Sequence, residues 1–290
     1  MDSILEAFSD YWKDKLIDGI MEIMAQVFVG MNNQVGTIAD NVGQTPSEFM
    51  PEVFNLIRTL SENVIMPIAG IILTFIACYE LIQLVISHNN LSNFETWIFF
   101  KWIFKTFVAV ELITHTFDFT MAIFDVAQHV VQQSGGVITQ QTEIRMVEAW
   151  NFRETLQSMD VMELLGIYLQ CNIIRTAAYI LSLLIFVIIN GRMIQIYLMV
   201  SLAPIPFSTF GNKEQSLMGQ NYVKSLFALG FQGFLIMVCV GIYAVLIQDI
   251  ALASADDIAG TLWMALGYTV LLAYTLFKTD DISRSILHAH

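Results

Sequence analysis

The chain has 290 residues, of which 56% are hydrophobic and only 13% are charged, and its net charge is −13. Globular domains carry about a quarter charged residues, so this composition excludes an ordinary soluble domain. Runs of about 20 apolar residues recur and match the thickness of a hydrocarbon layer, in which only helices and closed barrels satisfy their own backbone hydrogen bonds. We therefore predict an all-α fold, a polytopic transmembrane helical bundle with five spans or, alternatively, six. The acidic balance argues against electrostatic capture of nucleic acid by this chain.

Residues 4–28 carry apolar side chains at helical spacing, which predicts an amphipathic helix. Its opposite side is acidic, with Asp10, Asp14, Asp18 and Glu22. The segment is too charged to span a bilayer, and it suits the membrane interface, a partner helix or the protein's own bundle.

Residues 30–62 follow as a polar connector, in which Pro46 and Pro51 are helix breakers and a short helix is expected near residues 52–60. We therefore assign residues 1–62 to an N-terminal region of amphipathic helix and connector. Residues 63–125 then hold the first two transmembrane helices, of which the first covers Val64 to Ile86.

The second span, Thr96 to Phe124, contains ionisable residues that would share one face of a continuous helix. These residues are Lys101, Lys105, Glu111, His115 and Asp118. Such groups cost several kcal/mol at membrane depth, so they usually face water or protein. The alternative is that the two lysines snorkel to one interface and the aspartates to the other, which leaves Glu111 and His115 near the middle unexplained.

Glu111 and His115 are four residues apart, a spacing that suits either a proton-relay pair or a structural hydrogen bond within the bundle. A carboxylate in the membrane needs a counter-charge, and we expect Arg175 or Arg192 to supply it to Glu111 or Asp118.

The sequence from residue 126 to 160 is mixed in polarity, and we predict an extracytoplasmic loop there. The apolar stretch Val161 to Phe210 follows and reads either as one long helix that crosses once or as two crossings hinged at Asn190-Gly191-Arg192. Pro204 and Pro206 cannot continue a helical hydrogen-bond ladder, so the helix is expected to end or kink there, at a cytoplasmic turn.

Residues 161–278 contain the C-terminal transmembrane helices, with further spans at Tyr222 to Ile247 and Leu262 to Phe277, and residues 279–290 form a polar tail. Small residues in the first of these spans permit close helix contact, either within one subunit or between subunits. They include Gly230, Gly233 and Gly241.

The distribution of basic residues predicts the orientation of the chain. Lys278 and Arg284 place the C-terminus in the cytoplasm, and Lys213 and Lys224 place their turn on the same side. With five crossings, the N-terminus and the loop at 126–160 lie outside, which fits the charges better than six crossings.

Motifs of catalysis are missing from the sequence. Neither a nucleotide-binding loop nor the H-E-x-x-H and G-x-S-x-G motifs occur, and Cys78, Cys171 and Cys239 lack metal-ligand spacing. We therefore predict no catalytic, cofactor-binding or metal residues, and a protein that is not an enzyme.

Two segments carry a family resemblance: Gly191 to Phe210, with its A-P-I-P-F-S-T-F ending, and Asn221 to Phe234, N-Y-V-K-S-L-F-A-L-G-F-Q-G-F. Together they resemble the TrbL-like polytopic channel subunits of conjugative type IV secretion systems, in the form carried by Gram-positive conjugative elements. The resemblance is strongest over residues 175–250 and weaker over 60–125.

The resemblance implies a homo-oligomeric ring in the cytoplasmic membrane that helps single-stranded DNA, with its attached relaxase, to cross. The implied partners are other copies of the chain, further channel subunits including separate ATPases, and the lipid bilayer, with no cofactor. A secondary transporter or ion-coupled permease of a small solute is the competing class, since broken helices and intramembrane charges are also expected there. Against it, the two halves show no internal repeat. A structural anchor without a conduit is the third class.

Overall fold

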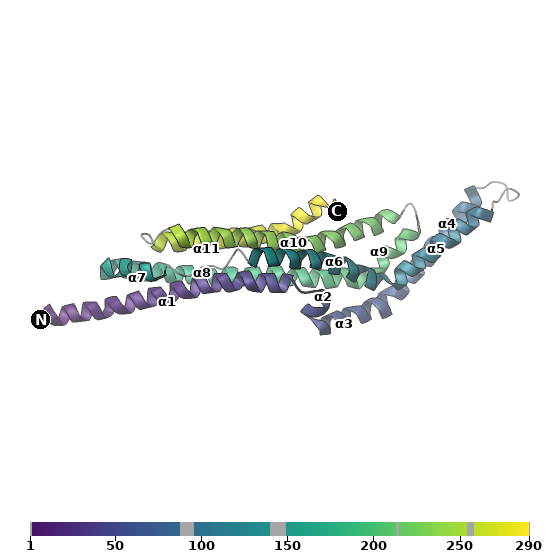
Figure 1. Cartoon of the computed structure of the whole chain (residues 1–290). Coiled ribbons are helices and arrows are strands. Elements are labelled where there is room, and N and C mark those ends of the chain that lie inside the picture. The colour runs from purple at the N-terminus through teal and green to yellow at the C-terminus, as the bar shows by residue number, and fades with distance from the viewer. Residues whose placement is uncertain (1, 88–95, 140–148, 213–214, 254–257, 290) are drawn as a thin grey trace. The chain divides into compact units, whose positions relative to one another are not determined.

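The computed structural model describes the chain except for residues 1, 88–95, 140–148, 213–214, 254–257 and 290. Every regular element among the described residues is a helix (Figure 1). In chain order the α-helices are α1 (Asp2–Val42), α2 (Pro46–Phe49), α3 (Pro51–Leu60), α4 (Met66–Ser87), α5 (Thr96–Thr114), α6 (Thr116–Thr139), α7 (Ala149–Ser158), α8 (Val161–Leu202), α9 (Pro204–Ser208), α10 (Ser216–Ala253) and α11 (Ile258–Ile286). A π-helical turn (Ser61–Ile65) follows α3, and a 3-10 turn (Thr209–Gly211) follows α9. The chain forms two compact units. The first comprises residues 1–43, 131–189 and 235–279, and the second comprises residues 44–130, 190–234 and 280–290.

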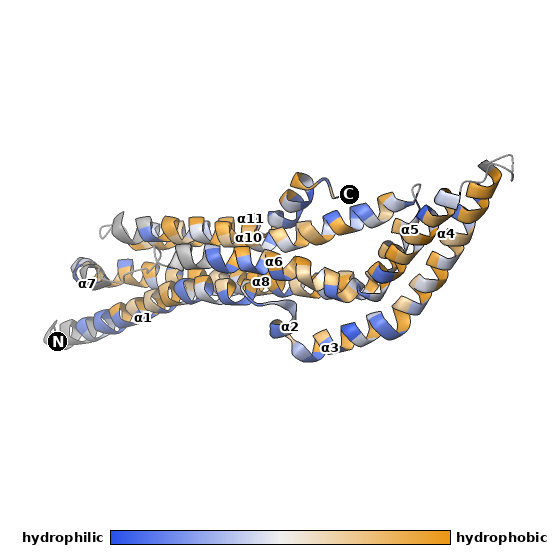
Figure 2. Cartoon of the chain, turned by 45° about the vertical axis from the view of Figure 1, so that its right-hand side comes forward, coloured by the Kyte–Doolittle hydropathy of each residue, from blue (hydrophilic) through white to orange (hydrophobic). Residues whose placement is uncertain are grey.

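The prediction of an all-α polytopic membrane protein is confirmed. Four described helices are long and apolar enough to cross a membrane, and there are five if the bent pair α5–α6 counts as one span. In Figure 2, hydrophobic residues dominate α4 and α5. Large side chains on these two helices are exposed, including Phe75 (73%) and Phe104 (69%). Exposed apolar side chains of this size are expected where a helix meets acyl chains.

Helix α8 decides between the two interpretations of the long apolar stretch. It runs without interruption from Val161 to Leu202, through Asn190 and Arg192, so the hinge needed for two crossings is absent from the structure. At 1.5 Å per residue its 42 residues extend about 63 Å, roughly twice the hydrocarbon thickness. The structure therefore contains one long helix over this stretch, as the interpretation with a single crossing requires.

In the first unit, α1 packs along the N-terminal half of α8. Ile17, Met24, Met31 and Ile38 recur every seven residues and are at most 3% exposed, as in a helix that buries one seam. The Tyr168 ring of α8 lies 2.9 Å from the point that a Cβ on Gly19 would occupy. The amphipathic helix thus docks on the protein's own bundle, one of the three placements that its sequence allowed.

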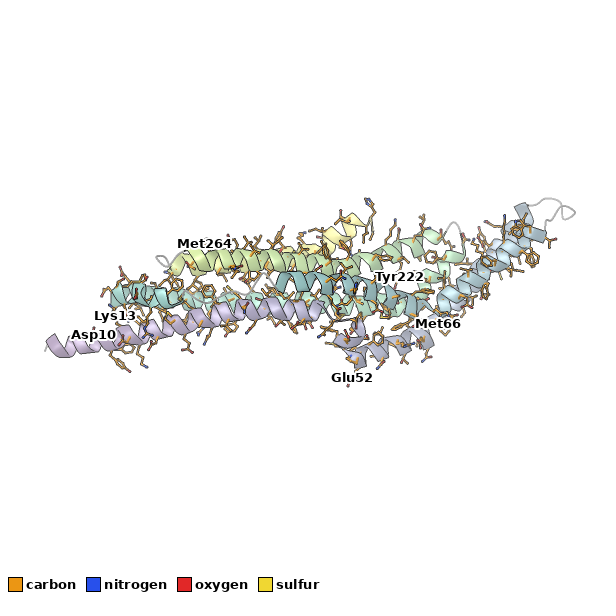
Figure 3. The ribbon with its side chains drawn as sticks, viewed as in Figure 1. Asp10, Lys13, Glu52, Met66, Tyr222 and Met264 are labelled. Carbon is orange, nitrogen blue, oxygen red and sulfur yellow. The ribbon has the colours of Figure 1, made fainter. Side chains whose placement is uncertain are left out.

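The connector begins later than the sequence indicated. Residues 30–42, which were expected to be part of it, continue α1 to Val42, because Val35 and Val42 extend the buried apolar seam. The acidic side of α1 remains accessible, and Asp10 is exposed (Figure 3). Glu52 on α3 and Met264 on α11 are also exposed. Arg153 of α7 donates to Asp18 of α1 at 3.2 Å.

Polar contacts join the other helices of the first unit. The hydroxyl groups of Tyr243 (α10) and Thr269 (α11) lie 3.0 Å apart, and both residues are buried. The indole N–H of Trp263 (α11) donates to Gln170 (α8) at 3.3 Å. Side-chain hydrogen bonds across helices are a common means of association where the surroundings are apolar.

The second unit is built on two apolar clusters. The first joins α6, α8 and α10 and contains Phe117, Phe124, Met193, Ile196, Tyr197, Val200, Leu226 and Leu229. The second joins α4, α5 and α9 and contains Ala69, Leu73, Ala109, Ile113, Ala203 and Phe207. Two tyrosines also satisfy backbone carbonyls in this unit: the Tyr197 hydroxyl donates to Pro46 at 2.6 Å and the Tyr222 hydroxyl donates to Met199 at 2.7 Å.

A capping box starts α2. The Thr45 backbone N–H donates to the Glu48 carboxylate, and the Glu48 N–H donates to the Thr45 hydroxyl. The backbone and hydroxyl of Thr45 stabilise the ionised form and hold the pKa of the Glu48 carboxyl below its usual value.

Two further boundaries differ from the sequence-based expectation. The segment 126–160, predicted as a loop, contains the end of α6 and all of α7. The tail at 279–290 is helical as far as Ile286, since α11 continues past Lys278. Ser283 is buried and donates to the Ala228 carbonyl of α10, which explains why this polar segment stays folded.

The uninterrupted α8 generates a topology prediction. Reporter fusions placed after Asp160 and after Gly211 are expected to report opposite sides of the membrane, because a single helix joins the two points. A fusion after Ser87 should report the same side as Gly211 if the bent pair α5–α6 crosses the bilayer. Equal signals from the Asp160 and Gly211 fusions would instead establish six crossings and overturn the single crossing of α8.

Candidate functional site

Charged side chains of the membrane helices gather at a sharp break in the helix at His115. Helix α5 ends at Thr114 and α6 begins at Thr116, and the two axes differ by 67°. Both threonine hydroxyls donate to carbonyls of the preceding turn: Thr114 to Val110 at 2.9 Å and Thr116 to Leu112 at 2.7 Å. Such bonds compete with the helical ladder and bend helices.

The break overturns the prediction of one continuous helix from Thr96 to Phe124. Three of the five predicted polar residues, Lys101, Lys105 and Glu111, lie on α5, whereas His115 occupies the break and Asp118 lies on α6. They therefore do not form one face of one straight helix. Instead they divide into two groups, one beside α4 and one at the break.

The group at the break is a cluster of partly exposed charges, which we name the break cluster: Arg58, Glu62, Glu111, His115 and Asp118. The imidazole of His115 lies 3.6 Å from the Glu111 carboxylate through Nε2 and 3.8 Å from the Asp118 carboxylate through Nδ1. Arg58 of α3 pairs with Glu62 at 2.8 Å and approaches Asp118 at 3.9 Å. Its guanidinium also lies 5.4 Å from the centre of the Phe117 ring.

The exposure of the break cluster bears on its chemistry. The side chains of Glu111, His115 and Asp118 are 51%, 55% and 67% exposed within one chain. In water such ion pairs would contribute little to stability. The bent pair α5–α6 is apolar enough to span a membrane, and there the same charges require water or a polar protein surface over them. One imidazole nitrogen of His115 faces each carboxylate, a geometry that suits a structural hydrogen bond as well as a proton relay.

The two arginines expected as counter-charges contact other groups in the structure, and the arginine beside Asp118 is Arg58. Arg192 is buried in the second unit and donates to the Leu229 carbonyl at 3.3 Å. Arg175 lies in the first unit and donates to Asn172 at 2.7 Å. No pattern in the sequence links Arg58 to a carboxylate sixty residues away, and only its i,i+4 spacing to Glu62 was visible.

The lysines form the second group, beside α4. Lys105 makes an ion pair with Glu80, whose side chain is 21% exposed. The ammonium group of Lys101 lies 5.6 Å from the centre of the Trp97 ring. The Trp102 indole N–H donates to the Ala77 carbonyl of α4 at 3.2 Å and holds the two helices together.

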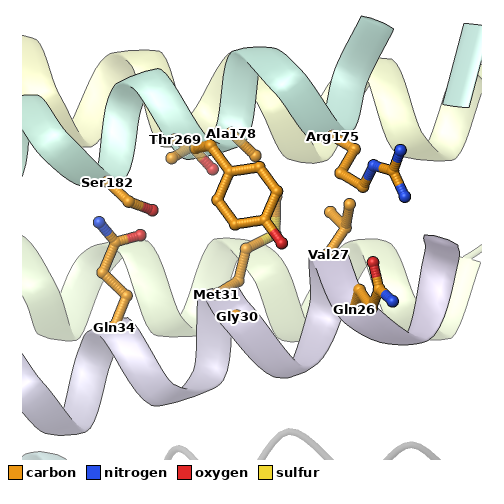
Figure 4. Close-up of a pocket in the computed structure, with 10 residues that line it drawn as sticks. Gln26, Val27, Gly30, Met31, Gln34, Arg175, Ala178, Ser182 and Thr269 are labelled. Atoms are coloured by element: carbon orange, nitrogen blue, oxygen red, sulfur yellow. The ribbon is translucent and has the colours of Figure 1, made fainter. Parts of the chain in front are cut away.

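Arg175 borders a small groove between α1 and α8 (Figure 4). Its volume is about 40 Å³, and its polar lining includes Gln26, Gln34 and Ser182. Figure 4 shows Gln34 across from Ser182 and Arg175 across from Gln26. The groove is too small for an organic substrate but large enough for a water molecule. Among the described residues, no group of three or more His, Cys, Asp or Glu side chains is arranged to hold a metal ion.

The predicted helix break at the prolines is present. Helix α8 ends at Leu202 and the short α9 starts at Pro204, with Pro206 as its third residue. Pro204 stands at the first helical position, where its missing N–H removes no helical bond. Pro204 and Phe207 are buried.

Of the three glycines predicted to permit close helix contact, Gly230 faces its own chain. A Cβ on Gly230 would lie 2.9 Å from the Ala127 Cβ of α6, and Gly233 is buried, whereas Gly241 is partly exposed. At Gly230 the close approach is therefore between helices of one subunit, the first of the two alternatives for these residues.

Because of the close approach at Gly230, we expect alanine to destabilise the protein there but not at a glycine with open space around it. Gly230→Ala should lower the free energy of unfolding by about 1–3 kcal/mol, because the new methyl group forces α6 and α10 apart. Gly267→Ala is the matched control, since nothing lies within 4 Å of its added Cβ, and it should be neutral or stabilising by up to about 1 kcal/mol. Thermal unfolding in detergent measures both, and equal midpoints for the two variants would contradict the contact.

A comparison with protein families assigns the chain. The family model described as "TrbL/VirB6 plasmid conjugal transfer like protein" matches residues 31–204, from the last third of α1 to the first residue of α9. The segment Asn221–Phe234, which contributed to the resemblance in the sequence, lies outside this match. No curated protein and no solved structure matches the chain. The family is one of conjugal transfer proteins and not a family of enzymes. Because the match covers more than half of the chain, this protein belongs to the TrbL/VirB6 family.

Proposed function

We propose that this protein is an integral membrane component of a conjugative type IV secretion channel and helps a relaxase-bound single strand of DNA to cross the cytoplasmic membrane. The observation that carries the proposal is the family match over α1 to α8, in a chain with four or five long apolar helices. A membrane component without a nucleotide-binding motif depends on separate ATPases for energy.

The channel component acts as a ring of identical copies, in the form carried by Gram-positive conjugative elements. Support for the ring comes from the break cluster. Glu111, His115 and Asp118 are half exposed in a single chain, although they belong to the bent pair of helices that is apolar enough to span the membrane. A neighbouring copy, or a water-filled path between copies, supplies the polar surroundings that such groups need.

The orientation follows from the basic residues. The C-terminus lies in the cytoplasm, because Lys278 and Arg284 end the last span, and the N-terminus lies outside with five crossings. In this orientation the first residues of α8 lie on the outer side and Pro204 lies near the inner surface.

The function predicts a clear genetic result. In-frame deletion of the gene should abolish conjugative DNA transfer, and expression of the intact protein should restore it. The purified protein should show neither ATP hydrolysis nor any other hydrolase activity. Conjugation at the wild-type frequency in the deletion strain would refute the proposal, and solute uptake by the protein alone in liposomes would instead support a permease.

A second prediction tests the break cluster. Replacing both Glu111 and Asp118 with Leu should lower the transfer frequency by about tenfold or more, because each polar contact within a membrane contributes about 1 kcal/mol to association. Replacing both Phe100 and Phe107 with Leu is the matched control. Each of these side chains is 58% exposed on α5 and faces lipid in this proposal.

The comparison requires equal amounts of each variant in the membrane fraction, measured by immunoblotting. Leucine removes charge from a spanning segment, so insertion of the Glu111 and Asp118 variant should not be impaired. Equal transfer by the two double variants would show that the break cluster contributes nothing to the channel.

A further inference from the structure

The helical hairpin α4–α5 contains a cavity that the channel function does not use. Its volume is about 380 Å³, and it opens between the end of α4 and the beginning of α5. The polar side chains that line it are Glu80 and Gln83 from α4 and Lys101 and Lys105 from α5, and Trp102 closes one side. The volume falls within the range of small-ligand sites.

The charge balance of this cavity is positive. Glu80 pairs with Lys105, so one carboxylate faces two ammonium groups. Lys101 lies over the Trp97 ring, and within the described part of the chain no carboxylate reaches ion-pair distance from it. The Gln83 amide donates one N–H to the Tyr79 hydroxyl at 2.7 Å, which leaves its second N–H. The cavity therefore offers an anion one uncompensated cation and one amide N–H.

The surroundings of the cavity are those of a membrane interface. The hairpin exposes Phe75, Ile82, Phe104 and Phe107, with exposed fractions between 56% and 73%. Lys101 stands in the second turn of α5, about 8 Å along the axis from its first residue. Trp97 and Trp102 flank it, and tryptophan is enriched at the level of lipid headgroups. An anion that reaches this cavity from the side meets apolar helix surface on its way.

We propose that this cavity binds the phosphate of an anionic phospholipid headgroup, with Lys101 as its principal contact and Lys105 and Gln83 as secondary contacts. The acyl chains of such a lipid lie along the exposed phenylalanines of the hairpin while the phosphate meets the lysines. Basic pockets between membrane helices recognise acidic lipids by this combination. The same apolar approach disfavours a DNA strand, whose phosphates keep their water. The site depends on the hairpin lying in the bilayer and not on DNA transfer.

Lipid retention by the purified full-length protein tests the proposal. The protein is extracted in a mild detergent and titrated with phosphatidylglycerol or phosphatidylcholine, and bound lipid is counted by native mass spectrometry. Wild-type protein should retain phosphatidylglycerol in preference to phosphatidylcholine, and Lys101→Gln should weaken that retention by about fivefold. Lys101→Arg should restore it. Glu80→Gln should strengthen it, because Lys105 is then free to contact the phosphate.

Lys15→Gln is the matched control, because it removes an exposed lysine of α1 outside the hairpin. Equal retention of phosphatidylglycerol by the Lys101→Gln and Lys15→Gln variants would overturn the site, as would equal retention of the two lipids by the wild type. Inorganic phosphate and a single-stranded oligonucleotide are tested as competitors. Displacement of the lipid by either one, with the same dependence on Lys101, would assign the cavity to a soluble phosphate or to DNA and reject the lipid. Because no step involves conjugation, a failure here leaves the channel function untouched, and a conjugation defect says nothing about the lipid.

Discussion

A polypeptide inside a hydrocarbon layer must satisfy its backbone hydrogen bonds within its own structure. This requirement accounts for the long helices of the chain and for the places where they stop. Helix α8 continues for 42 residues because nothing in its sequence forces an end before Pro204. The π-helical turn at Ser61–Ile65 and the bend at His115 occur where other bonds replace the regular ladder, as the threonine hydroxyls do beside His115.

Polar side chains obey the same requirement less strictly. Several buried ones are paired with backbone or with each other: the Tyr222 hydroxyl with Met199, Ser283 with Ala228, and Tyr243 with Thr269. Arg192 reaches the Leu229 carbonyl in the same way. The Ser61 hydroxyl and the Gln128 amide nitrogen are buried without a hydrogen-bond partner in the part of the chain that the structure describes. By contrast, the break cluster and the lysines of α5 are paired only in part and stay exposed on an apolar hairpin. Such groups are costly in lipid, so water or a polar protein surface is expected over them.

The kind of function rests on the family match, and the structure supplies the helical membrane architecture. The match of residues 31–204 places the chain among conjugal transfer proteins. The structure adds a helical membrane component with charged side chains at the break between α5 and α6 and in the cavity of the α4–α5 hairpin. Helix α5 contributes residues to both groups.

The sequence by itself determined the helical class, the membrane location and the approximate spans, because hydropathy and residue spacing are local properties of the chain. It also located the stop at Pro204, since proline acts on its own turn. Tertiary structure alone decided that Arg58 lies beside Asp118, that Lys105 meets Glu80 and that Gly230 faces Ala127. Those contacts join residues 25 to more than 100 positions apart. The bend at His115 and the extension of α1 to Val42 depend on both sequence and tertiary structure. The threonine hydrogen bonds and the apolar seam are local features of the sequence, but they fix the structure only when neighbouring helices bury one side.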